Sequence, residues 1–276
     1  MGNLILGPSP QQTSASSTTV PSPTMMGMEE EDFAKLAQSV FIMIPTRGTI
    51  ASDLALMFGH WARFGTTITA VKDEFGGFVE LNRANMCRLF QQVRRDRPEL
   101  TYLVMIDDDE AVSWDAPYRL AAWGEPIVSG LICSHEDHRG IFANIFVEDE
   151  YKIARMPSFN RTKSIPGRGL KECASVGSGL LCIRHDVIDG IVDSGEKPFV
   201  LSEKDRAACL ETGVLKMGED TTFCAQAKKL GFQSYVDFGV RGKHFKTIAV
   251  QWPQSHVDYS LDVRDWKVDS KDYFHG

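Results

Sequence analysis

The sequence contains no apolar run of the ~18–20 residues that a helix needs to cross a bilayer. Its first residues also lack the basic residues and the small-residue cleavage site of a secretory signal. The six cysteines form no C-x-x-C pair and have no regular spacing, which is typical of reduced thiols rather than of a disulfide framework. We therefore expect a cytoplasmic protein without a transmembrane segment.

Positive charge is missing from the beginning of the chain, because residues 1–32 contain no Lys or Arg. The full sequence of 276 residues has 30 Lys and Arg against 37 Asp and Glu, a formal net charge of −7. Such a balance argues against a general polyanion binder. Residues 1–28 are rich in Ser, Thr, Pro and Gln and show no hydrophobic period, so we predict a disordered, low-complexity tail over residues 1–32.

The chain then alternates short apolar runs with amphipathic segments. Strands are predicted at Ser39–Ile44, Thr67–Val71 and Tyr102–Ile106, and helices at Asp53–Phe64 and Leu81–Arg95. This βαβαβ order predicts an α/β fold, a single domain with a mostly parallel sheet flanked by helices. Ligands of such folds bind at the carboxyl ends of the strands.

Four consecutive acidic residues, Asp107–Glu110, directly follow the third of these apolar runs. Alternate residues of a strand point to the same face, so Asp107 and Asp109 are expected to project together. Two close carboxylates repel each other unless a cation or hydrogen-bond donors lie between them. Mg²⁺ and Mn²⁺ commonly bridge such carboxylates to the phosphates of a substrate. The alternative is an exposed acidic turn.

Asp220 stands at the start of another predicted helix, Thr221–Leu230, in the segment Met217–Asp220 (MGED). Backbone N–H groups and the helix dipole favour an ionised carboxylate there, and such a group can accept a proton from an attacking hydroxyl. The alternative is an Asp that only caps the helix. His244 is the third signal, although one His beside a strand is more often structural than a metal ligand.

Together these segments resemble the GT-A glycosyltransferase superfamily, in particular its inverting, DxD-containing group that is similar to family two. The resemblance covers residues 39–246. The matching segments, in chain order, are Phe41–Arg47, Asn82–Asn85, Leu103–Asp109, Ser175–His185, Gly218–Asp220 and His244.

The resemblance implies a metal-dependent hexosyltransferase-like enzyme that moves a sugar from a nucleotide-sugar donor, in particular a UDP-sugar, to an acceptor hydroxyl. It implies a GT-A (Rossmann-like) catalytic domain over residues 33–250. Residues 33–125 would form its nucleotide-binding half, and residues 126–250 its acceptor- and metal-binding half. A C-terminal tail, 251–276, would pack on or near the site.

The resemblance also implies a role for each matching residue. Asp220 would be the catalytic base of an inverting reaction, and Glu219 would orient the acceptor or the donor sugar. Asp107, Asp109 and His244 would hold Mn²⁺ or Mg²⁺. The donor and its nucleotide would contact Pro45, Thr46, Arg47, Arg83, Asn85, Asp107, Asp108, Gly177 and Gly179.

Two further clusters have competing interpretations. Cys133, His135, Asp137 and His138 suggest zinc, but their tight spacing lacks a second ligand pair, so we favour a polar loop that lines the donor-sugar pocket. The basic stretch 155–171 contains no acidic residue. It is predicted to be a solvated loop, and the alternative is a lid over the diphosphate or a contact with an anionic acceptor.

Other functions stay open on the sequence alone. A nucleotidyltransferase would usually show a Gly-rich loop with Arg and Lys near the first strand, where this chain has only Pro45–Gly48. A non-catalytic nucleotide-sugar-binding module is the alternative of another class. The acceptor could be a saccharide, a lipid-linked sugar, a protein or a modified base in DNA, and the last of these would make the enzyme a DNA glycosyltransferase.

Overall fold

A computed structural model describes residues 27–72, 78–136, 140–143, 145–149, 152–155, 169–200 and 218–245, together with residues 203 and 207. These residues belong to one compact unit that ends at Phe245. Most of the predicted tail (residues 1–26), most of the basic stretch (156–168) and the whole segment 251–276 lie outside the described residues.

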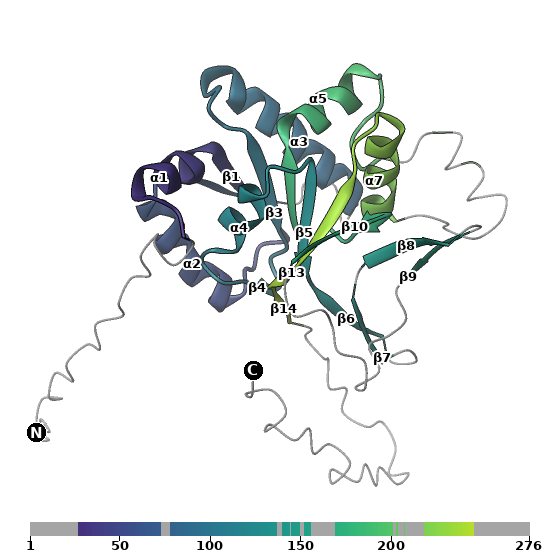
Figure 1. The fold of residues 1–276 in the computed structure, drawn as a ribbon, viewed down its shortest axis with the longest axis horizontal. Helices are drawn as coiled ribbons and strands as arrows, with labels where there is room; N and C mark the ends of the chain where they lie inside the picture. Colours follow the sequence, from purple (N-terminus) through teal and green to yellow (C-terminus); the bar gives the residue numbers. More distant parts are fainter. Residues whose placement is uncertain are drawn as a thin grey trace, which may run out of the picture. The chain divides into compact units, whose positions relative to one another are not determined.

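A seven-stranded mixed sheet forms the centre of the unit (Figure 1). Five strands point the same way, and the other two, β10 and β12, run in the opposite direction. The predicted single α/β domain with a mostly parallel sheet is therefore confirmed. From one edge to the other, the strands are β10 (Leu170–Cys173), β13 (Ser234–Arg241), β5 (Ile127–Leu131), β12 (Leu180–Arg184), β3 (Tyr102–Ile106), β1 (Val40–Thr46) and β2 (Thr67–Lys72).

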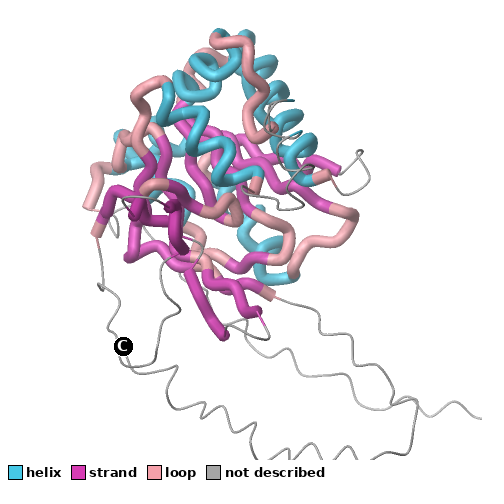
Figure 2. Tube along the Cα trace, turned by 90° about the vertical axis from the view of Figure 1, so that its right-hand side faces the viewer, coloured by secondary structure: helices cyan, strands magenta, loops and turns pink. Residues whose placement is uncertain are grey.

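Helices cover both faces of this sheet (Figures 1 and 2). One face packs against α1 (Glu30–Ser39), α2 (Ser52–Arg63) and α4 (Ala116–Ala122). The other packs against α3 (Val79–Asp96), α5 (His185–Asp193) and α7 (Glu219–Lys229). Strands β1, β3, β5 and β12 are buried on both faces, which explains why they are largely apolar. Within the described part of the chain, no helix is both long and apolar enough to pass through a lipid bilayer.

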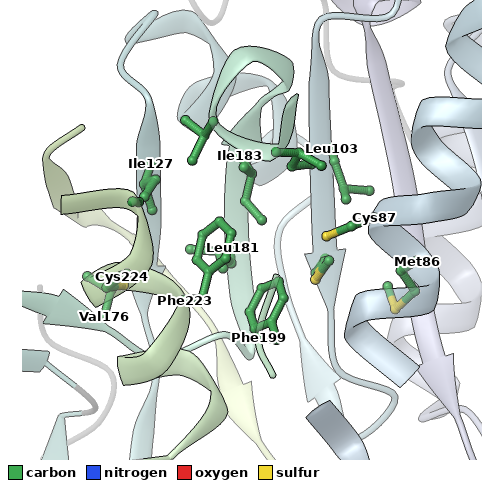
Figure 3. Close-up of a cluster of buried hydrophobic side chains, with 14 of the residues drawn as sticks. Met86, Cys87, Leu103, Ile127, Val176, Leu181, Ile183, Phe199, Phe223 and Cys224 are labelled. Carbon is green, nitrogen blue, oxygen red and sulfur yellow. The ribbon is translucent and has the colours of Figure 1, made fainter. Parts of the chain in front are cut away.

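The layer between the sheet and α3, α5 and α7 is a close-packed apolar cluster (Figure 3). Phe223 of α7 stacks on Phe199, with ring centroids 4.3 Å apart and an interplanar angle of 7°. In the view of Figure 3, Phe223 overlaps Leu181 of β12, and Met86, which belongs to α3, lies to the right of both. This packing holds the N-terminal ends of α3 and α7, which carry Arg83 and Glu219.

Short strands complete the unit beside the main sheet. β4 (Glu110–Ala111) pairs with β14 (Lys243–His244), and this pairing places Glu110 opposite His244. β6 (Cys133–Glu136) pairs with β7 (Gly140–Ala143). A three-stranded sheet has the order β11 (Ser175–Val176), β8 (Ile145–Asp149) and β9 (Lys152–Arg155). The β4–β14 pair matters most, because it joins two segments more than 100 residues apart in the sequence.

Several elements differ from the sequence prediction. Strand β1 continues through Pro45, which is tolerated because the pairing with β3 has already ended at Met43 and only the β2 side is still paired. Helix α1 begins at Glu30, inside the range predicted as tail. The acidic residues of its first turn suit a helix N-terminus, and Phe33 anchors it in the core. Helix α4 was not predicted.

Candidate functional site

The acidic segment Asp107–Glu110 forms a tight turn at the carboxyl end of β3. The N–H of Asp107 donates to the Gly179 carbonyl at 2.9 Å, and the N–H of Glu110 donates to the Asp107 carbonyl at 3.1 Å. From the end of β1, the N–H of Arg47 donates to Asp108 Oδ2 at 3.2 Å. Glu110 is only 1% exposed. The segment is thus held among strand ends and is not a simple exposed turn.

Asp109, Glu110 and His244 form a cluster that could hold a metal ion. One ligand atom from each residue lies within 4.8 Å of the others, and His244 Nε2 is 3.1 Å from Asp109 Oδ2. The buried atoms Glu110 Oε2 and His244 Nδ1 have no hydrogen-bond partner in the described part of the chain. Such atoms are costly to leave unsatisfied, and carboxylate oxygens suit Mg²⁺ and Mn²⁺. The donor set therefore fits a divalent cation.

Glu110 is the residue of this cluster that the sequence prediction missed. Burial raises the pKa of its carboxyl group to about 9, and the charges of Asp107 and Asp109 add to the shift. A divalent cation beside Glu110 would offset this repulsion, because a nearby positive charge favours the carboxylate. Strict strand alternation pointed to Asp107 and Asp109, whereas the turn after Ile106 brings residues 109 and 110 to His244.

Arg83 of α3 links the end of β3 to the start of α7. Its side chain is 3% exposed, Nη2 donates to Asp107 Oδ1 at 2.8 Å, and Nε lies 3.7 Å from Glu219 Oε1. Burial raises the pKa values of Asp107 and Glu219, and the positive charge of Arg83 opposes both shifts. Asp107 thus pairs with Arg83 and is not one of the three residues of the Asp109–Glu110–His244 cluster, and its role as a metal ligand stays a prediction.

Helix α7 places Glu219 and Asp220 in its first turn. Its N-cap is Gly218, so Asp220 is the second helical residue and not the cap. Asp220 Oδ1 accepts the N–H of Thr221 at 2.7 Å and the Thr221 hydroxyl at 3.3 Å. The free backbone N–H groups of this first turn lie beside the carboxylate.

Two adjoining clefts meet at Arg83 and Asp107. The first has a volume of about 240 Å³. The second has a volume of about 170 Å³. The cation cluster spans both, since Asp109 lines the first cleft, and Glu110 and His244 line the second. The predicted donor residues in the first cleft are Pro45, Thr46, Arg47, Arg83, Asp107 and Asp108, and the second contains Gly177, Gly179, Glu219 and Asp220.

Asn85 is the one predicted donor residue that lines neither cleft. Its Oδ1 accepts from Arg88 Nη2 at 2.6 Å. Asn82, one turn earlier in α3, lines the first cleft instead and is 4% exposed. The start of α3 lies nearer the strand ends, so an asparagine before Arg83 reaches the cleft and the one after it does not. The N-x-x-N spacing of Asn82 and Asn85 offered no sequence signal to choose between them.

The two alternative clusters cannot be placed at this site. The side chains of His135, Asp137 and His138 lie outside the described residues, as does most of the basic stretch 155–171. Cys133 is half-buried, and burial raises the pKa of its thiol.

Gly179 lies against the acidic cluster and provides a specific test. A Cβ atom there would lie 3.1 Å from Glu110 Oε1 and 3.5 Å from Asp107 Oδ2. Gly179→Ala should therefore displace Glu110 and weaken Mn²⁺ binding by about tenfold, which corresponds to about 1.4 kcal/mol. Isothermal titration calorimetry with Mn²⁺ measures this change. Gly59→Ala is the matched control, because a Cβ at that helical position has nothing within 4 Å and should leave Mn²⁺ affinity unchanged. Equal Mn²⁺ affinity of both variants would contradict the assigned cluster.

Comparisons with known proteins complete the description. No protein-family model matches the sequence, and no curated protein matches it significantly. Among solved structures, A197 from STIV aligns with a TM-score of 0.48 and 15% identity over 75% of this chain and 86% of that chain. GalNAc-T7, solved with UDP, GalNAc and Mn²⁺, aligns with a TM-score of 0.43 and 10% identity over 83% of this chain and 47% of that chain. A glycosyltransferase involved in glycosylation of the major capsid of PBCV-1 gives a TM-score of 0.32 and 12% identity over 72% and 93% of the two chains. At these scores the likenesses carry no argument about activity.

Proposed function

We propose that the protein is a metal-dependent glycosyltransferase of the GT-A type, which transfers a sugar from a UDP-sugar to an acceptor hydroxyl with inversion. The observation that carries this proposal is the position of the Asp109–Glu110–His244 cluster at the junction of two clefts. These residues would hold a cation between a cleft at the strand ends and a cleft that Glu219 and Asp220 of α7 also line. A nucleotide-sugar needs such a divided site, because its diphosphate separates the nucleoside from the sugar.

The first cleft suits the nucleotide. It lies at the carboxyl ends of β1 and β3 and at the start of α3, the place where α/β folds bind nucleotides. Thr46, Arg47 and Asn82 line it. The buried amide of Asn82 supplies hydrogen-bonding capacity for a base or a ribose, since its Oδ1 has no partner in the described residues. Arg47 adds positive charge for phosphate.

The second cleft suits the transfer step. Asp220 would accept the proton of the acceptor hydroxyl while the acceptor oxygen bonds to the anomeric carbon and the bond from that carbon to the diphosphate oxygen breaks. Glu219, held by Arg83, would orient the hydroxyl groups of the bound sugar. When bound, Mn²⁺ or Mg²⁺ would neutralise the charge that develops on the diphosphate. Attack from the side opposite the leaving group gives inversion.

The proposal is tested by incubating the full chain with UDP-sugars and Mn²⁺ and measuring the release of UDP. Release that requires Mn²⁺ and stops on addition of a chelator is expected. The absence of UDP release and of UDP binding across a panel of UDP-sugars would contradict the proposed function. Binding of UDP-sugars without any release would instead favour a non-catalytic binding module.

Glu110→Gln should remove Mn²⁺-dependent UDP release, because the variant loses a charged ligand at the centre of the cluster. The amide has nearly the same shape, so the thermal unfolding temperature without metal should change little. Glu99→Gln is the matched control, since Glu99 is exposed and pairs only with Arg97 among the described residues. A Glu110→Gln variant that releases UDP at the unmodified rate in limiting Mn²⁺ would exclude Glu110 as a ligand.

A further inference from the structure

The turn Lys197–Val200 contains the one strained backbone conformation of a non-glycine residue in the described part of the chain. Phe199 has a φ of 66°, in the left-handed region, where the Cβ atom of an L-residue is crowded. Its side chain is fully buried. Such a conformation persists only where the surrounding contacts hold it, and it is enriched at functional sites. The contacts that hold Phe199 therefore indicate which part of the molecule depends on this turn.

Helix α7 supplies these contacts. The Phe199 ring stacks on Phe223, with ring centroids 4.3 Å apart (Figure 3). Gln226, about one turn further along α7 and 6% exposed, bonds to the backbone of the turn. Its Oε1 accepts the Phe199 N–H at 3.2 Å, and its Nε2 donates to the carbonyls of Lys197 at 3.0 Å and Val200 at 3.3 Å. A single buried amide thus satisfies three backbone groups of the turn.

The same helix carries two residues of the second cleft. Glu219 and Asp220 lie in the first turn of α7 and line that cleft. Residues 219, 223 and 226 follow the i, i+4, i+7 spacing of one helix face, so Phe223 and Gln226 lie on the face that carries Glu219. Ring stacking and the hydrogen bonds of an amide both depend on direction. A rotation or shift of α7 against the turn would therefore break them.

We propose that Phe199 and Gln226 are positioning residues for the transfer step, which fix helix α7 so that Asp220 and Glu219 keep their places in the second cleft. This inference rests on the proposed function, because it takes Asp220 as the base of the transfer. Neither positioning residue lines either of the two clefts, so neither is expected to touch the substrate. A displacement of about 1 Å that originates far from the reacting atoms can lower a rate by about 10²-fold. The expected effect is therefore on turnover and not on the binding of the nucleotide.

The test compares full-length Gln226→Met with the unmodified chain in Mn²⁺, well below the unfolding temperature of both, and measures UDP release from the UDP-sugar that the unmodified chain uses fastest. Methionine fills a similar space but makes none of the three hydrogen bonds, so the turnover number should fall by about tenfold or more. The dissociation constant for UDP should change little, because no residue of α7 lines the first cleft. Tyr118→Phe is the matched control. It removes a buried hydrogen bond outside both clefts, the one between the Tyr118 and Thr66 hydroxyls at 2.7 Å, and should leave the turnover number unchanged.

An unchanged turnover number in Gln226→Met overturns the inference. A loss of UDP affinity as large as the loss of turnover also overturns it, because the effect would then not be confined to the transfer step. An equal fall in Tyr118→Phe does the same, since any lost buried hydrogen bond would then have this effect. Should Gln226→Met fail to fold, Phe199→Leu, which stays apolar but loses the ring stacking, decides by the same criteria. If the unmodified chain releases UDP from no UDP-sugar, the proposed function is overturned and this inference with it.

Discussion

Asp220→Asn should lower the turnover number by about 10²–10⁴-fold, the usual contribution of general-base catalysis. Asn cannot take the proton of the acceptor hydroxyl. Its side-chain oxygen can still accept the N–H of Thr221, which Asp220 Oδ1 accepts at 2.7 Å, so the first turn of α7 should stay intact. Donor affinity should change little, because the nucleotide cleft and the cation cluster do not include Asp220.

Steady-state rates and thermal unfolding, measured on the same samples, separate the two roles of Asp220. Asp193→Asn is the matched control, because Asp193 is exposed at the end of α5 and lies in neither cleft. If the turnover number of Asp220→Asn equals that of the unmodified chain, another residue is the catalytic base. Glu219 would then be the next candidate. A large fall in unfolding temperature would show that the residue acts mainly in stabilising the first turn of α7.

Arg83→Met should lower the free energy of unfolding by about 3 kcal/mol, the lower end of the range for breaking a buried ion pair. Methionine fills much of the same space, but Asp107 and Glu219 lose their shared cation. Their side chains keep 30% and 24% exposure, so water relieves part of the cost and the upper end of the range is not expected. Urea denaturation measures the change.

Arg88→Met on the same helix is the control for this measurement. Arg88 is exposed and bonds to Asn85 within the helix, so its loss should cost at most about 0.5 kcal/mol. Adding Glu219→Gln to Arg83→Met should restore part of the stability, because one uncompensated carboxylate disappears. Equal losses in Arg83→Met and Arg88→Met would mean that the ion pairs of Arg83 contribute little to the fold.

Local patterns were sufficient to predict most of the sheet. Strand β3 was predicted with its observed bounds, because five apolar residues are followed at once by acidic ones. The boundaries that differed depended on neighbours in space. Pro45 stays in β1 because the strand has a partner on only one side there, and α1 forms partly within the range predicted as tail because Phe33 packs in the core. Neither condition can be read from the residues themselves.

The sequence by itself determined most of the residues that line the clefts, because Pro45–Arg47, Asp107–Glu110 and Glu219–Asp220 stand at ends of predicted elements. Only the tertiary structure decided which partner each acidic residue contacts. The β4–β14 pairing places His244 beside Asp109 and Glu110, and the packing of α3 places Arg83 beside Asp107. The physical reason is that a carboxylate contacts its partner over a few ångströms, and the partner belongs to a strand or helix far away in the chain. Spacing along the sequence determines only which side chains share a face of one element.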